Sequence, residues 1–304
     1  MRIGLIDVDG HSGFPNLALM KLSAWHKQKG DNVEWYSAMF SGHMDRVYMS
    51  KVFTFSEDYP YYVDTDEIIK AGTGYKDYTT VLPEEAEHIF PDYSIYPSCD
   101  YAIGFLTRGC IRNCPWCVVP RKEGKISPYE EWRNVKRNDS KRILFMDNNV
   151  LASSHGIRQI EEMAGAQGIR IDFNQGLDAR LIDDKIAELL GRIKWDKCVR
   201  ISCDTSVMIP IVQKAIERLI KNGIRPKNIF VYALVQDVDE SYYRIMEISS
   251  TGAYVFAQPY RDFDGAEPTR EQKQLSRWCN RKEYFVSQTW EEYRRRRGGE
   301  RHDC

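Results

Sequence analysis

Six short apolar segments recur between residues 99 and 262, and each of them ends in polar residues. They are CDYAIGFLT (99–107), RILFMDNN (142–149), IRIDFNQG (169–176), CVRISCDTS (198–206), NIFVYALVQD (228–237) and AYVFAQPYRD (253–262). Two of the stretches between them, 181–193 and 207–223, have the apolar spacing of amphipathic helices. This alternation predicts repeated β–α units with parallel strands.

The size and regularity of these units favour a partial (β/α)6 TIM-like barrel over residues 99–265. In that fold the functional groups lie where strands end and loops begin, which is where the polar residues of this chain recur. A doubly wound open sheet, with a ligand at its switch point, is the alternative that the pattern leaves open.

The N-terminal part also alternates between strand-like and helix-like segments. Strands are predicted at 3–7, 33–38, 46–55 and 66–71, with a helix from residue 17 that stops at Gly30. We therefore expect a small Rossmann-like parallel α/β domain over residues 1–78. Residues 79–98 contain three prolines and no clear period, which is typical of a linker, and 266–304 predict a C-terminal helix with a basic tail.

Charge and hydropathy exclude several classes of protein. The formal net charge of −1 gives no overall positive field that would attract nucleic acid or anionic membrane. No apolar run approaches the length of a membrane span, and the first residues, MRIGLIDVDG, lack the features of a signal peptide. We expect a cytoplasmic protein whose eight cysteines are free thiols by default.

Three of those cysteines, Cys110, Cys114 and Cys117, lie within eight positions, directly after the first strand of the series. Thiolates are soft ligands that suit zinc and iron–sulfur clusters. A structural zinc normally has four protein ligands, and the nearest further candidates, Cys99 and His88, lie upstream without the spacing of a zinc site. A four-iron cluster bound by three thiolates would instead leave one iron open to another ligand.

The spacing CxxxCxxC, with Trp116 just before the last cysteine, resembles the signature of the radical S-adenosylmethionine (radical SAM) enzymes. With the strand series, the resemblance extends over about residues 99–262. It implies a [4Fe–4S] cluster on Cys110, Cys114 and Cys117, and SAM chelated at the open iron. Reductive cleavage of SAM would yield a 5′-deoxyadenosyl radical that acts on a substrate. The resemblance also implies a reductant partner such as flavodoxin or ferredoxin, and it leaves the substrate open.

In that superfamily, polar side chains at successive strand ends hold SAM. By position, Trp116 is the candidate for the adenine, and the polar residues after the second strand are candidates for the methionine amino group. The full set of SAM-binding candidates is Trp116, Asp147, Asn148, Asn149, Asn174, Gln175, Ser202 and Asp204. The Gly-Gly-Glu that many members carry after the second strand is missing here, and a turn or capping role is the alternative for each residue.

After the sixth strand, Gln258, Tyr260 and Arg261 are weak candidates for catalytic or substrate-binding residues. Arg261 would suit a carboxylate or phosphate, because a guanidinium binds such groups with two hydrogen bonds. A surface ion pair for Arg261 and a packed role for Tyr260 are the alternatives.

The N-terminal domain resembles the cobalamin-binding half of many two-domain radical SAM enzymes. Asp9, His11 and Gly13 form DxHxG, one residue shorter than the DxHxxG of the cobalt-binding loop, and 71–75 is a glycine turn that would suit the corrin tail. The resemblance therefore allows cobalamin as a further cofactor, and methylation as the outcome. A structural cap is the alternative, with an isomerisation, epimerisation or other rearrangement as the reaction.

A second function from another class also stays open. Arg294–Arg297 form a basic run near the C-terminus. With a zinc ion on the cysteines, the chain would be a non-catalytic, zinc-stabilised module that binds nucleic acid through this run. A solvated tail is the simpler interpretation of the arginines.

Overall fold

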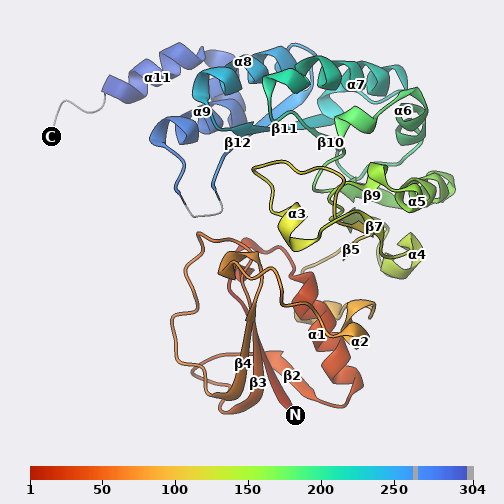
Figure 1. The fold of residues 1–304 in the computed structure, drawn as a ribbon, viewed down its shortest axis with the longest axis vertical. Helices are drawn as coiled ribbons and strands as arrows, with labels where there is room; N and C mark the ends of the chain where they lie inside the picture. The colour runs from red at the N-terminus through yellow and green to blue at the C-terminus, as the bar shows by residue number, and fades with distance from the viewer. Residues whose placement is uncertain (263–265, 300–304) are drawn as a thin grey trace.

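The computed structural model describes residues 1–262 and 266–299, which form an N-terminal and a C-terminal α/β part (Figure 1). The N-terminal part contains a parallel sheet in the order β2-β1-β3-β4. Its strands are β1 (Arg2–Asp7), β2 (Asn32–Trp35), β3 (Met44–Ser50) and β4 (Thr65–Ala71). The predicted small parallel sheet is confirmed, although β2 and β3 end a few residues earlier than the apolar pattern indicated.

The two faces of this sheet are covered in different ways. Helix α1 (Leu17–Gln28) packs Leu19 and Leu22 against Ile3 and Leu5 on one face. The Asn16 side chain accepts a hydrogen bond from the Leu19 N–H, which caps the first turn. On the other face, Tyr59 from the β3–β4 connection packs with Met49 where a doubly wound fold would place a second helix.

The predicted linker, 79–98, contains short helix α2 (Glu84–Glu87) and the 3₁₀ turn η3 (Tyr93–Ile95). It is fastened to α1 by Asp92, whose carboxylate accepts hydrogen bonds from Ser23 Oγ and Lys27 Nζ, each at 2.6 Å. The segment therefore connects the two parts and is bonded to α1 through Asp92.

All six predicted strands of the second part are present, each shorter than its apolar segment. The first three, β5 (Ala102–Gly104), β8 (Arg142–Phe145) and β9 (Arg170–Phe173), form one parallel sheet. The next three, β10 (Val199–Ser202), β11 (Ile229–Val235) and β12 (Tyr254–Pro259), form another. Parallel bridges, Ile171 with Trp195 and Leu177 with Ile201, link the two sheets in chain order. The fold is mixed α/β with several small parallel sheets, and the strand pairings of the described residues do not close a barrel.

The side chains of these strands alternate between two faces. One set, including Phe145, Phe173 and Val231, is buried against the connecting helices. The helices are α4 (Trp132–Val135), α5 (Ser154–Gly165), α6 (Asp184–Gly191), α7 (Ile209–Lys221) and α8 (Val238–Ser249). The alternate set faces the other way, and most of its members are only half-buried. We call this second surface the inner face; its residues are Arg142, Leu144, Asp172, Arg200, Phe230, Tyr232 and Phe256.

The C-terminal segment forms three helices where the sequence predicted one. They are α9 (Arg270–Asn280), α10 (Lys282–Ser287) and α11 (Trp290–Gly299). Helix α9 ends at Asn280, whose side chain bonds to β12. The side-chain amide donates to the Ala257 carbonyl and accepts from the Ala257 N–H, each at 2.8 Å.

In the predicted basic run, Arg294 pairs with Glu271 at 2.5 Å. The Arg297 side chain and residues 300–304 lie outside the described residues, as do 263–265 at the predicted end of the barrel. None of the described helices combines the length and the apolar character needed to cross a membrane.

Candidate functional site

The loop that carries the three cysteines begins at the carboxyl end of β5. A two-residue hairpin, β6 (Thr107–Arg108) with β7 (Ser127–Pro128), closes its base, and short helix α3 (Val119–Lys122) follows the last cysteine. Gly109 has a φ of 78°, and a Cβ there would lie 2.3 Å from the Lys125 carbonyl oxygen, so the loop needs glycine at this crossing. The result is a loop that presents Cys110, Cys114 and Cys117 as free, half-buried thiols.

Asp147 anchors this loop from the end of β8. Its buried carboxylate accepts hydrogen bonds from the Thr107 N–H at 2.6 Å, the Thr107 hydroxyl at 2.7 Å and the Leu106 N–H at 3.0 Å. Burial raises the pKa of Asp147 to about 6, and these hydrogen bonds oppose the rise. Both oxygens are thus engaged within the protein, which gives Asp147 a structural role; its predicted contact with SAM stays a prediction.

Asn149 connects the second strand end directly to a cysteine. Its side chain is 2% exposed, and its amide donates to Cys110 Sγ at 3.4 Å. The Arg112 N–H donates to the same sulfur at 3.3 Å. Two N–H donors, one from a side chain and one from the backbone, thus fix the position of the Cys110 sulfur beside the end of β8. Asn149 Oδ1 and Asn148 Nδ2 are buried polar atoms without a hydrogen-bond partner among the described residues, so this strand end has donor and acceptor capacity left for a ligand.

Asp178 is a site residue that the sequence analysis missed. Its side chain is 5% exposed and accepts hydrogen bonds from Arg112 Nε at 2.9 Å, Arg180 Nε at 2.6 Å and Asn149 Nδ2 at 3.3 Å. Burial acts to raise the pKa of Asp178, but the hydrogen bonds from Arg180 and Arg112 outweigh it and hold the pKa below its usual range. Asp178 therefore joins the cysteine loop to the loops after β8 and β9.

The same loops place charges beside the thiols. Burial raises the pKa of Cys114, and the positive charge of Arg180 acts in the opposite direction. Asp204, after β10, also acts electrostatically on Cys114 and Cys117. Residues at or just after the ends of β5, β8, β9 and β10 thus lie near the cysteine loop.

Asp204 lies beside a buried arginine. Burial raises its pKa, while Arg244 and the Ser202 hydroxyl act to lower it. Arg244, which is 1% exposed, donates to the Cys203 and Leu234 carbonyls and so fixes the ends of β10 and β11. Ser202 and Asp204, both predicted SAM contacts, are therefore held next to the cysteine loop by a buried guanidinium.

The other candidates lie in more varied places. Trp116 is half-buried in the turn between Cys114 and Cys117, Gln175 is exposed, and the Asn174 carbonyl accepts from the Tyr232 hydroxyl at 3.2 Å. Gln258 is exposed near the end of β12, and Tyr260 is half-buried. Arg261 pairs with Glu267, and its guanidinium lies 4.3 Å from the Phe55 ring centroid. Arg261 thus forms the ion pair that was the alternative to substrate binding, and it also contacts the N-terminal part through Phe55.

The N-terminal residues compared with a cobalamin loop make contacts within the N-terminal part or face outward. His11 is exposed in the turn η1 (Gly10–Ser12), and the Asp9 carboxylate accepts from the Val52 N–H at 2.6 Å, which holds the β3–β4 connection. A Cβ at Gly72 would lie 2.4 Å from the Lys51 carbonyl oxygen, and one at Gly74 would lie 2.7 Å from that of Phe53. The glycines therefore admit the chain's own backbone, and we derive no step through a corrin.

Among residues 1–262 and 266–299, no three His, Cys, Asp or Glu side chains converge closely enough to hold one metal ion. A four-iron cluster takes one thiolate on each of three irons, so its thiolates are spread around the cluster. A scan against protein-family models and a search of the curated proteins found no match to this chain.

Proposed function

We propose that this chain is a radical SAM enzyme in which Cys110, Cys114 and Cys117 bind a [4Fe–4S] cluster. The observation that carries the proposal is the position of the three free thiols, on one loop at the carboxyl end of the first of six parallel strands. Two N–H donors to Cys110 Sγ and the orphaned amide atoms of Asn148 and Asn149 support it.

We propose further that the six strands are a partial (β/α)6 barrel. The parallel pairings run in chain order from β5 to β12, and the bridges Ile171–Trp195 and Leu177–Ile201 join the two sheets. An order of this kind places all carboxyl ends at one edge, where the active site of such a fold lies.

Each residue of the site has a task in this proposal. When bound, the cluster and SAM would supply the 5′-deoxyadenosyl radical that abstracts hydrogen from the substrate. Asp178 orients Arg112 and Arg180, whose positive charges offset those of the three thiolates and favour cluster binding. Asn149 Oδ1, which has no hydrogen-bond partner among the described residues, would accept a hydrogen bond from the methionine amino group of SAM. Asp204 and Ser202 offer acceptors for ribose hydroxyls.

The test is anaerobic reconstitution with iron and sulfide, followed by reduction in the presence of SAM. We expect brown protein with broad visible absorption and formation of 5′-deoxyadenosine. Replacing any one of Cys110, Cys114 and Cys117 by Ala should abolish both, whereas Cys198→Ala, at another half-buried thiol, should abolish neither. Colourless protein with stoichiometric zinc, or deoxyadenosine formation by the Cys110→Ala variant, would refute the assignment.

A further inference from the structure

The segment 108–125, which carries the three cysteines, is strongly basic. It contains five arginine or lysine residues and one acidic residue, Glu123, in a chain whose formal net charge is −1. Arg108 binds the Glu123 carboxylate through both Nε and Nη2, and the Glu123 side chain is only 7% exposed. The exposed charged residues of the segment are therefore all basic. They are Arg121, Lys122 and Lys125, which we call the basic face.

The basic face lies next to the cysteines that would bind the cluster. Helix α3 begins two residues after Cys117. Directly after α3, the Gly124 carbonyl accepts a hydrogen bond from the Cys110 N–H at 3.1 Å. The Lys125 backbone passes so close to Gly109 that a Cβ there would lie 2.3 Å from the Lys125 carbonyl oxygen. A protein that docks on the basic face would therefore be close to a cluster on these cysteines.

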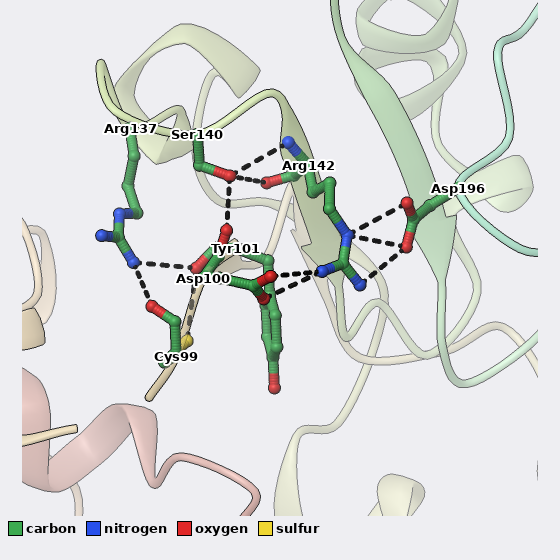
Figure 2. A network of polar contacts seen from close by, with 7 residues as sticks. All are labelled: Cys99, Asp100, Tyr101, Arg137, Ser140, Arg142 and Asp196. Atoms are coloured by element: carbon green, nitrogen blue, oxygen red, sulfur yellow. Dashed lines mark hydrogen bonds and ion pairs between the residues drawn. The ribbon is translucent and has the colours of Figure 1, made fainter. Parts of the chain in front are cut away.

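The amino ends of the strands carry their charges differently. There, Arg142 lies between Asp196 and Asp100, with nitrogen–oxygen distances of 3.0 and 2.8 Å (Figure 2). The Asp100 side chain is 71% exposed, so solvent meets a carboxylate beside this guanidinium. At the cysteine loop the carboxylate of Glu123 is buried instead. The C-terminal part thus presents positive charge beside the cysteines and mixed charge at the opposite ends of its strands.

This surface suits an acidic partner that delivers electrons. A patch of one sign of charge attracts a partner of the opposite sign and speeds their encounter. The cysteine loop also exposes apolar surface, at Ile111, which is 50% exposed, and at Pro115. Redox partners form weak complexes with small interfaces, for which a few apolar contacts beside charged ones are sufficient. The cleavage of SAM proposed above is reductive and therefore requires an electron from outside this chain.

We propose that the basic face is the docking surface for an acidic protein that donates one electron at a time. The electron leaves the donor, which is oxidised, and enters the cluster, which is reduced; no bond forms or breaks and no proton moves in this step. The role in electron transfer rests on the proposed function. Docking depends on charge and needs neither cluster nor SAM.

The first test measures binding to the full chain without a cluster. The probes are an isotope-labelled flavodoxin and an isotope-labelled plant-type ferredoxin, whose NMR signals are followed as the chain is added. We expect signal shifts with at least one probe at low ionic strength, and weaker affinity as salt is added, because salt screens exposed charges.

Variants locate the docking surface. Lys122→Glu/Lys125→Glu should weaken the affinity for the better probe about tenfold. Lys125→Glu alone keeps the hydrogen bond from Lys122 Nζ to Thr73 Oγ1 and should weaken it about threefold. The matched control is Lys221→Glu/Lys227→Glu, which changes the net charge by the same amount. Its two exposed lysines lie at the end of α7 and in the turn η7 (Pro226–Asn228), before β11, and we expect the wild-type affinity.

The second test measures electron transfer in the reconstituted protein. The rate of cluster reduction by the reduced probe should decrease about tenfold in Lys122→Glu/Lys125→Glu at low salt. The yield of 5′-deoxyadenosine with excess dithionite in place of the protein donor should stay unchanged in this variant.

Absence of binding by both probes, or equal affinity in the two double variants, would overturn the proposal. It would also be overturned if a single-stranded RNA lost affinity in Lys122→Glu/Lys125→Glu while donor binding stayed the same, because the face would then bind nucleic acid. These results would leave the cluster assignment intact, since deoxyadenosine formation with dithionite tests that assignment separately.

Discussion

Replacing Asp178 by Ala removes the carboxylate that joins the loops after β8 and β9 to the cysteine loop. The change leaves the donors on Arg112, Arg180 and Asn149 without their shared acceptor. Breaking a fully buried ion pair costs about 3–5 kcal/mol, and breaking an exposed one costs about 0.2–1 kcal/mol. Asp178 is 5% exposed but both arginines are 32% exposed and regain water, so we expect a loss of about 2 kcal/mol.

The assay is urea denaturation followed by tryptophan fluorescence, together with the rate at which a thiol reagent modifies Cys110, Cys114 and Cys117. The matched control is Asp184→Ala, because Asp184 also pairs with an arginine, Arg218, but is 82% exposed. We expect a loss of about 0.5 kcal/mol in the control and unchanged thiol reactivity. If both variants lose the same stability and their thiols react at the wild-type rate, Asp178 does not hold the cysteine loop.

Three further predictions concern other parts of the fold. Because the folded pKa of Asp147 is about 6 and lies above its unfolded value, wild-type stability relative to Asp147→Asn should fall by about 2 kcal/mol as the pH rises from about 4 to 6; a flat difference in denaturation midpoints would contradict this. Burial lowers the pKa of His26, which contacts Asp31 and Tyr48. The stability of the wild type relative to His26→Gln should therefore be greatest above about pH 6.5 and decrease as the pH decreases. A decrease in this difference on raising the pH would contradict the prediction. Gly109→Ala should abolish iron–sulfur reconstitution, whereas Gly168→Ala, at the same kind of positive φ but with open space for a Cβ, should retain it; equal iron content in the two variants would show that the crossing at Lys125 is not required.

The parts of the fold with a clear apolar period were predictable from the sequence. The six strands and helices α6 and α7 follow that period, because burial on one face requires it. The end of α9 at Asn280 was not predictable from the sequence, because it depends on a contact with Ala257, 23 residues away.

The candidate site shows the same limit. The three cysteines stand out because they are close in sequence. Asp178 contacts Arg112 only through the fold, across 66 positions, and the sequence offered only a weak sign of it: the polar stretch LDAR directly after NQG. The role of the N-terminal glycines also could not be predicted from the sequence. A glycine that would make room for a corrin and a glycine that makes room for the Lys51 backbone look identical in a sequence.

The contact between Asn280 and Ala257 determines where the second sheet ends. The last strand of a sheet has unpaired backbone groups that another chain can join, which is a common origin of aggregation. Here a side-chain amide from α9 bonds to both the N–H and the carbonyl of one β12 residue, as the backbone of a neighbouring strand would. One asparagine thus protects the middle of β12 from strand exchange with other molecules at high protein concentration.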